Sequence, residues 1–396
     1  MTAGSDTADR RAERLTGLQA LRFAAALSVF SLHLVWFVPT TSVLANNIIL
    51  YGNLGVPLFY VLSAFALMHS TRAYSNSPGW TLQFYAKRFF RIAPLFYAMC
   101  IISVLIFYAQ IPVTVLELAL NITFLNNLVP AYAPSLVHAG WSVSVEALFY
   151  LVFPLVFIFV RSIKVAAILL ALSIAIALLL RPLFDRIPTV LGTYANWAWL
   201  INLPYFLFGA LAFLIYDRVR ATRIAKEGGV SIAAACHFGF GVIALATLSP
   251  LFFFNDQLRA WARVDTMCWA AFFATLCVWV SVRPMRFLAW APFQFLGERS
   301  YSLYLVHVPL IIFSVPALTF AQDSMIGVLG RSGASIAIIV LGFTAVTLVA
   351  TLTYMLIERP GMFLGKIIVK RLRGFRTDGG DTKEPEIDIA ARIART

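Results

Sequence analysis

Two ionisable side chains lie inside the first apolar stretch of the chain, "LRFAAALSVFSLH" (residues 21–33), where an ionised group is costly. Arg22 and His33 are eleven residues apart, which is three helical turns plus about 20°, so on a helix both point to the same side. They would lie about 16 Å apart along the axis, a cation near one membrane face and an imidazole above it. Two simpler interpretations stay open: Arg22 extends to the lipid headgroups, and His33 bonds a neighbouring helix as a packing residue.

A carboxylate in a later apolar stretch could complete this pair. In "GWSVSVEALFYLVFPL" (140–155), Glu146 lies five residues after Trp141, about 7 Å below the outer surface at which this span begins. The same depth is estimated for His33, so the two side chains could meet in one pocket. Glu146 would then hold the histidine tautomer, as the third member of a catalytic triad does. The alternative is that Glu146 pairs with an unrelated polar group.

A basic cluster stands at the start of the third apolar run. The stretch "YAKRFFRIAPLFY" (85–97) carries Lys87, Arg88 and Arg91. The charges alone fit an ordinary group of positive-inside residues. The functional interpretation is a site for the phosphates of an anionic ligand, since the arginine fork matches phosphate oxygens.

Two further stretches bring polar groups to the membrane. "GERSYSLYLVHVP" (297–309) carries hydroxyls and an imidazole, either as pocket residues or as simple interhelical hydrogen bonds: Ser300, Tyr301, Ser302, Tyr304 and His307. Glu358, in "LIERP" (356–360), is expected to form a structural ion pair with a nearby arginine.

The composition places these residues in a membrane protein. Of the 396 residues, 61% are hydrophobic and 12% are charged, and the mean hydropathy is +0.84, whereas soluble domains are nearer half apolar and a quarter charged. Apolar runs of about 20 residues recur, each long enough to cross roughly 30 Å of hydrocarbon. The runs are continuous and do not alternate as barrel strands would. The predicted fold is therefore an all-α, polytopic bundle of transmembrane helices.

The apolar runs and the charges predict a topology. We expect ten spans, at 18–38, 48–69, 92–110, 141–160, 163–180, 197–216, 231–254, 266–282, 301–320 and 334–357. With the N-terminus inside, 26 of the 31 Lys and Arg residues fall on the inner side and five on the outer side, which predicts that both termini are cytoplasmic. The net charge of +13 then reflects topology, and no nucleic-acid partner is expected.

Three regions follow from this topology: a cytoplasmic tail (1–17), a transmembrane domain (18–360) and a basic, partly disordered cytoplasmic tail (361–396). No cleavage site follows the first apolar run, so we expect an uncleaved helix there. The four cysteines lie in apolar runs without ligand spacing, so they are interpreted as buried thiols and no metal site is inferred.

These segments, taken in order, resemble the membrane acyltransferase-3 family, the O-acetylase type of bacterial polysaccharide-modifying enzymes. Arg22 and His33 match its pattern of an Arg, ten residues and a His in the first helix. The other similar segments are "GVPLFYVLSAFAL" (55–67), "KRFFRIAPLFY" (87–97), "WSVSVEALFYLVFP" (141–154), "LGERSYSLYLVHVP" (296–309) and the Glu358/Pro360 pair. The resemblance covers residues 15–362. Pro57 stands where many members carry Asp, Ala64 stands where Gly is usual, and no SGNH-type esterase domain follows, so a stand-alone form is expected.

The resemblance implies an O-acyltransferase that moves an acyl group, expected to be acetyl, from cytoplasmic acyl-CoA to a hydroxyl of a glycan or other acceptor. The CoA phosphates would bind Arg22, Lys87, Arg88 and Arg91, and the thioester would reach His33. His33 would act as general base on the acceptor hydroxyl or briefly accept the acyl group, and Glu146 would orient it. The acceptor side or the pocket wall would be formed by Trp141, Ser142, Ser144, Ser300, Tyr301, Tyr304 and His307.

The implied location is the bacterial cytoplasmic (inner) membrane, with the lipid bilayer, acyl-CoA, a hydroxylated acceptor and a separate extracytoplasmic protein as partners. No tightly bound cofactor is expected. The acceptor stays open among O-antigen sugar, exopolysaccharide, cell-wall glycan and a small metabolite such as a macrolide. The competing class is a transporter or flippase of an anionic or lipid-linked solute, against which the absence of an internal repeat in the sequence counts. A passive scaffold would not need buried ionisable groups.

Overall fold

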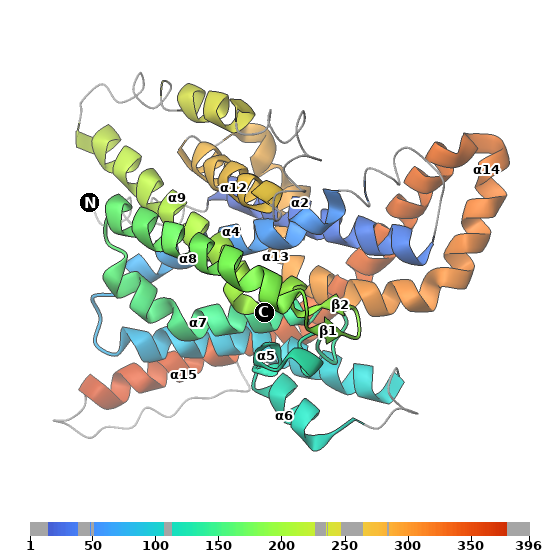
Figure 1. The fold of residues 1–396 in the computed structure, drawn as a ribbon, viewed down its shortest axis with the longest axis horizontal. Coiled ribbons are helices and arrows are strands. Elements are labelled where there is room, and N and C mark those ends of the chain that lie inside the picture. Colours follow the sequence, from blue (N-terminus) through green and yellow to red (C-terminus); the bar gives the residue numbers. More distant parts are fainter. Residues whose placement is uncertain are drawn as a thin grey trace, which may run out of the picture.

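The computed structural model describes residues 15–38, 48, 51–106, 113–225, 235, 237–246, 264–282 and 285–377, and most of these residues are helical (Figure 1). The longer helices are α2 (Thr16–Phe37), α4 (Gly55–Arg72), α5 (Trp80–Ile106), α7 (Trp141–Phe159), α8 (Ile163–Phe184), α9 (Trp199–Ala225), α12 (Val264–Val282), α14 (Ser300–Thr353) and α15 (Arg359–Thr377). Within the described residues the sheet consists of β1 (Pro188–Thr189) paired antiparallel with β2 (Gly192–Thr193). The all-α prediction is confirmed.

Seven helical segments of the described chain are long and apolar enough to cross a membrane, which supports a multi-pass protein. The predicted number of ten spans is not confirmed. Ser300–Arg371 counts as one segment although it contains the predicted spans 301–320 and 334–357. α14 bends at Gly330, whose φ of 66° lies in the left-handed region that favours glycine. The parts of α14 before and after this bend run in different directions (Figure 1). Most of the predicted span 231–254 lies outside the described residues.

The third span begins earlier than the sequence predicts. α5 starts at Trp80 rather than at residue 92, so Lys87, Arg88 and Arg91 lie on the helix instead of before it. Hydropathy predicts where the chain leaves the apolar layer of the membrane, not where a helix ends. Because Lys and Arg are good helix formers, a helix can continue through a charged stretch. The three cations are therefore held on one rigid element.

Glycines bring the central helices close together. A Cβ atom at Gly209 of α9 would overlap the backbone of Val61 in α4, and one at Gly297 in α13 (Ala291–Glu298) would overlap the backbone of Gln19 in α2. Small residues at such crossings let two helix backbones approach, which is how helices associate where no water drives them together. The core that results holds α2 and α4 at the centre of the bundle.

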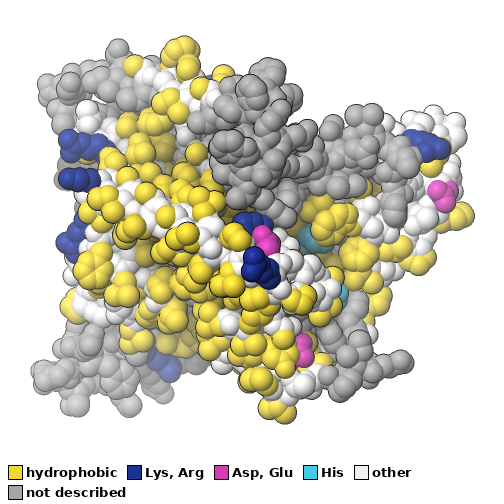
Figure 2. Space-filling model, in the orientation of Figure 1, with side chains coloured by type: hydrophobic (Ala, Val, Ile, Leu, Met, Phe, Trp, Pro, Cys, Tyr) yellow, Lys and Arg dark blue, Asp and Glu magenta, His cyan; other side chains and the backbone are white. Residues whose placement is uncertain are grey.

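The surface carried by α8 is apolar. Ile168, Leu172 and Leu179 are exposed by 50%, 54% and 77% and lie on one helical stripe. Figure 2 shows this face covered mostly by hydrophobic side chains, with Lys and Arg gathered along its left margin. An apolar belt bordered by cations is the pattern of a helix bundle that faces lipid.

Residues 113–140 fold into a cap over the start of α7. The cap contains α6 (Val115–Ile122) and two short 3-10 helices, and its asparagines are fully buried. The amide of Asn127 donates to the carbonyl of Trp197 (2.6 Å), and the amide oxygen of Asn126 accepts a hydrogen bond from Ser144 (2.6 Å). These bonds attach the cap to α7 and to the segment before α9.

α15 packs along α5 (Figure 1). A Cβ at Gly361 would lie 2.8 Å from Cγ of Pro94, and a Cβ at Gly365 would lie 2.8 Å from Cβ of Phe90, so the four-residue glycine spacing allows close contact. The predicted tail from residue 361 therefore begins with a helix that is part of the bundle. Residues 378–396 lie outside the described residues.

The first prediction concerns this contact. Gly365→Leu should displace α15 and destabilise the protein by about 1–3 kcal/mol, because its side chain must occupy space filled by Phe90. The measurement is the thermal unfolding midpoint in detergent. Gly327→Leu is the matched control, since a Cβ there has no heavy atom within 4 Å. Equal midpoints for the two variants would contradict the packing.

Candidate active site

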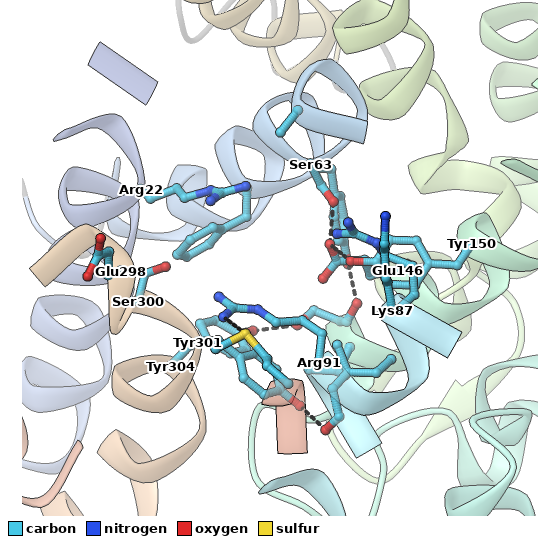
Figure 3. Close-up of a pocket in the computed structure, with 18 of the residues that line it drawn as sticks. Arg22, Ser63, Lys87, Arg91, Glu146, Tyr150, Glu298, Ser300, Tyr301 and Tyr304 are labelled. Carbon is cyan, nitrogen blue, oxygen red and sulfur yellow. Dashed lines mark hydrogen bonds between the residues drawn. The ribbon is translucent and has the colours of Figure 1, made fainter. Parts of the chain in front are cut away.

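A cavity of about 520 Å³ lies where α2, α4, α5, α7, α14 and α15 meet (Figure 3). Its charged lining consists of Arg22 from α2, Lys87, Arg88 and Arg91 from α5, Lys366 from α15, Glu146 from α7 and Glu298 from α13. Serine and tyrosine hydroxyls complete the polar wall. The structure thus brings all four cations that were predicted to bind an anionic donor to a single cavity.

The guanidinium of Arg22 points into the cavity (Figure 3). Arg22 is partly buried, interacts electrostatically with Glu146 and lies near the like charges of Arg88 and Arg91. The structure gives it no hydrogen bond or ion pair with any residue in the described part of the chain. Arg22 therefore does not extend away to the membrane surface, and its donors are available to a ligand.

Glu146 accepts hydrogen bonds from two hydroxyls. Ser63 of α4 donates to its Oε1, and the Tyr150 hydroxyl donates to the same atom at 2.6 Å. Sequence analysis missed both partners, although Tyr150 is four residues after Glu146 and so faces the same side of α7. Hydroxyl donors let a carboxylate remain in an apolar bundle.

The predicted contact between Glu146 and His33 is wrong. Among the described residues, Glu146 bonds Ser63 and Tyr150, whereas Nδ1 of His33 lies 2.9 Å from the Val29 carbonyl and 3.2 Å from Nε2 of His307. The depth estimate counted from the start of α7 as if that were the membrane surface. The cap covers that start, so counting residues from it does not measure depth. Glu146 is near Arg22, not His33.

His33 and His307 form a pair beyond the cavity. Neither lines it, but Tyr304 does, and His307 follows Tyr304 by one turn of α14. The rings of the two histidines lie 4.9 Å apart, and His307 is 1% exposed. His138 of the cap is within electrostatic reach of His33, and its own burial lowers its pKa below the ordinary value. At neutral pH His138 is therefore uncharged.

Hydroxyl groups line the side of the cavity nearest this pair, where the Tyr304 ring contacts the His307 ring at a centroid distance of 5.6 Å. The Tyr304 hydroxyl lies 2.6 Å from the Ser142 hydroxyl and donates to the Ala139 carbonyl at 3.2 Å. Ser300 and Tyr301 also line the cavity, and the Tyr301 hydroxyl donates to the carbonyl of Ile92 at 2.6 Å. These predicted pocket residues therefore have structural partners as well as a place at the cavity.

Besides His307, two of the predicted acceptor or pocket residues, Trp141 and Ser144, do not line the cavity. Ser144 donates into the cap, as described above, and the Trp141 ring contacts the Trp197 ring edge-on at a centroid distance of 5.0 Å. Both hold the cap against α7. The resemblance implied an acceptor-side position for both, but neighbouring residues on a helix face different sides.

Glu358 forms an ion pair with Arg91, which lines the cavity. Glu358 is fully buried and also accepts a hydrogen bond from Ser302 at 2.6 Å. It ends a five-residue π-helical turn (Tyr354–Glu358) between α14 and α15. Arg91 also donates a hydrogen bond from Nη1 to Sδ of Met362 at 3.0 Å. Arg91 thus joins α5, α14 and α15.

Lys366 is the cation that sequence analysis missed. It lies on α15 at the rim of the cavity, beside Met362. The hydropathy pattern assigned it to a tail, and only the glycine spacing before it indicated a packed helix.

The fold and site define a class: a multi-pass membrane protein with a basic cavity among its helices and a pair of contacting histidines beyond it. The chain belongs to the acyltransferase-3 family, since the family model described as an acyltransferase domain matches residues 15–355.

Several curated proteins are similar to this chain. It is 28% identical to "Acyltransferase MdmB" of Streptomyces mycarofaciens, over 97% of this chain and 99% of that one. It is 24% identical to "Putative peptidoglycan O-acetyltransferase YrhL" of Bacillus subtilis, over 92% of this chain and 58% of that one. It is 25% identical to "O-acetyltransferase OatA" of Staphylococcus aureus, over 76% of this chain and 51% of that one. The chain spans little more than half the length of the last two. No solved structure matches it.

The second prediction concerns the buried ion pair. Glu358→Ala should destabilise the protein by roughly 3 kcal/mol or more, because it leaves the Arg91 cation without its buried carboxylate partner. Ser302→Ala, which removes the hydroxyl but keeps the ion pair, should cost less, about 2 kcal/mol, as expected for a hydrogen bond to a charged group. Thermal midpoints in detergent compare the two. If Ser302→Ala were the more damaging change, the ion pair would not be the main contact there.

Proposed function

We propose that the chain is a membrane O-acyltransferase that moves an acyl group, acetyl in the simplest case, from acyl-CoA to a hydroxyl of an acceptor. The observation that carries this proposal is the cavity, to which three helices contribute cations: Arg22, Lys87, Arg88, Arg91 and Lys366. Membership of the acyltransferase-3 family and the O-acetyltransferase names of two relatives support it.

The charges of the cavity favour a donor with phosphates. Five lining cations face two lining carboxylates, and Glu358 neutralises Arg91 from behind, which leaves an excess of two positive charges. Arg22 and Arg88 offer planar forks that suit phosphate oxygens. Lys87, which lies 3.5 Å above the Tyr74 ring, and Lys366 add point charges at the rim. The CoA phosphates would bind this group, while Glu146 balances Arg22.

The reaction proposed for His33 is proton abstraction. The pantetheine arm would extend from Arg22 toward His33, which lies about 16 Å further along α2 and is of the order of the arm's length. His33 would take the proton of the acceptor hydroxyl as its oxygen attacks the thioester carbonyl, and the departing CoA thiolate would recover a proton. Transfer through an acyl-histidine would use the same ring nitrogen.

The acceptor would approach from the side of the cap. A glycan or a small hydroxylated molecule fits this proposal. In it the membrane is the bacterial cytoplasmic membrane, and the distribution of Lys and Arg supports a cap on its outer side and both termini inside. The donor and the acceptor would then enter from opposite membrane faces and meet near His33.

The third prediction tests this function directly. His33→Ala should reduce acyl transfer by about 100-fold or more, which is the usual contribution of a general base. The assay follows release of CoA and transfer of label when purified protein in lipid nanodiscs receives radiolabelled acetyl-CoA and glycans from the expressing cells. His237→Ala is the matched control, because His237 accepts a hydrogen bond from Trp279 away from the cavity.

Full transfer by the His33→Ala variant at normal expression would end the proposal for that residue. Transport of a solute without release of CoA by the intact protein would favour a transporter instead.

The fourth prediction concerns the donor. Lys366→Gln should raise the KM for acetyl-CoA about tenfold and leave kcat nearly unchanged, since a phosphate contact far from the thioester binds the ground and transition states equally. Arg371→Gln, on the same helix about 140° around its axis, should leave KM unchanged. If both changes raised KM equally, the effect would come from general surface charge.

A further inference from the structure

His307 is a buried residue for which the proposed reaction has no role so far. Its Nδ1 lies 2.6 Å from the Tyr304 carbonyl, and its Nε2 lies 3.2 Å from Nδ1 of His33. Both ring nitrogens are therefore engaged, and the side chain is 1% exposed. The two rings meet nearly at a right angle, with an interplanar angle of 70°.

Two backbone carbonyls determine where the protons of this pair lie. A carbonyl oxygen can only accept a hydrogen bond, so Nδ1 of His307, facing the Tyr304 carbonyl, carries a proton. In the neutral ring its Nε2 is then an acceptor. Nδ1 of His33 faces the Val29 carbonyl at 2.9 Å as well as Nε2 of His307, so it too must donate. The opposite tautomer would direct a lone pair at a carbonyl oxygen.

It follows that Nε2 of His33 is the unprotonated nitrogen. No side chain among the described residues bonds this atom. The Trp36 ring lies beside the imidazole and nearly perpendicular to it, at a centroid distance of 5.4 Å. A base whose lone pair is exposed and whose other nitrogen is held by a buried acceptor has the geometry that general-base catalysis requires.

We propose that His307 is the positioning residue of the catalytic base: it holds His33 in the Nδ1–H tautomer and accepts a hydrogen bond from the imidazolium formed during the reaction. This inference rests on the proposed function, in which His33 takes the proton of the acceptor hydroxyl. It replaces Glu146, whose hydrogen bonds are to Ser63 and Tyr150, as the group that orients His33.

The balance of the step is simple. The hydroxyl proton passes to Nε2 of His33, the new ester bond forms as the carbon–sulfur bond breaks, and the proton leaves His33 for the CoA thiolate. The Nδ1 proton of His33 stays in place throughout, and its hydrogen bond to His307 becomes stronger while His33 is charged.

The fifth prediction uses two variants of His307. In His307→Gln, the longer side chain can place its amide oxygen near the position of Nε2 and accept from His33. In His307→Asn, the shorter side chain can replace only the contact of Nδ1 with the Tyr304 carbonyl. We expect the Gln variant to keep kcat within several-fold of the intact protein and the Asn variant to lose on the order of 100-fold, which is less than the roughly 10⁴-fold lost when a triad histidine loses its charged partner, because His307 is neutral.

The KM for acetyl-CoA should be unchanged in both variants, since His307 does not line the donor cavity. Equal kcat values for the Gln and Asn variants, or a loss that appears in KM alone, would overturn the positioning role. Loss of transfer in His33→Ala together with full transfer in His307→Asn would overturn this inference and leave the proposed function standing.

A spectroscopic measurement on the intact sequence avoids any folding defect in the variants. The chain has five histidines, so ¹⁵N-histidine NMR in nanodiscs at neutral pH gives a small set of signals, and His33→Gln identifies the signal of His33. The Nδ1–H tautomer is expected at His33, and the Nε2–H tautomer there would refute the proposal.

Discussion

Charges in this bundle must be balanced by the protein itself, because lipid solvates none of them, and that balance decides what the cavity can bind. Arg91 is neutralised by the fully buried Glu358, which Ser302 also contacts. Glu146 accepts hydrogen bonds from two hydroxyls and interacts electrostatically with Arg22. Arg91 is committed to an ion pair, whereas the donors of Arg22 face the cavity, and in the proposed function an anionic ligand completes their coordination.

The same requirement explains why α15 belongs to the site although the family match ends at residue 355. The ion pair of Arg91 with Glu358 is enclosed by packed helices, and α15 is one of them. Its two glycines allow it to lie directly against α5, and Met362 then covers the Arg91 guanidinium. The π-helical turn before α15 places Glu358 next to Arg91. The ion pair, the contact between α15 and α5 and the position of Lys366 at the cavity rim therefore all depend on how α15 packs.

Much of this could be predicted from sequence, because residue type and helical spacing report which groups share a face. The helical membrane fold and the need of Glu358 for an arginine follow from the cost of charge in lipid. The grouping of Arg22 with the cations of α5 was implied by the family resemblance. Depth did not follow. Counting from Trp141 assumed that every span starts at the membrane surface, and the folded cap over α7 removes that reference. Lys366 was missed because hydropathy cannot distinguish a packed amphipathic helix from a solvated tail.

The mistaken pairing also shows why an imidazole suits the place beside His33 better than a carboxylate. A carboxylate at His307 would need hydrogen-bond donors, as Glu146 has, and would carry a buried charge whether or not the base is protonated. A neutral imidazole anchored to the Tyr304 carbonyl offers one lone pair in a fixed direction at a smaller desolvation cost. It stabilises the imidazolium less strongly than an anion would. The pair therefore acts through the tautomer and the direction of His33 more than through its basicity. A thioester donor is compatible with a weaker base, because thiolate is a good leaving group.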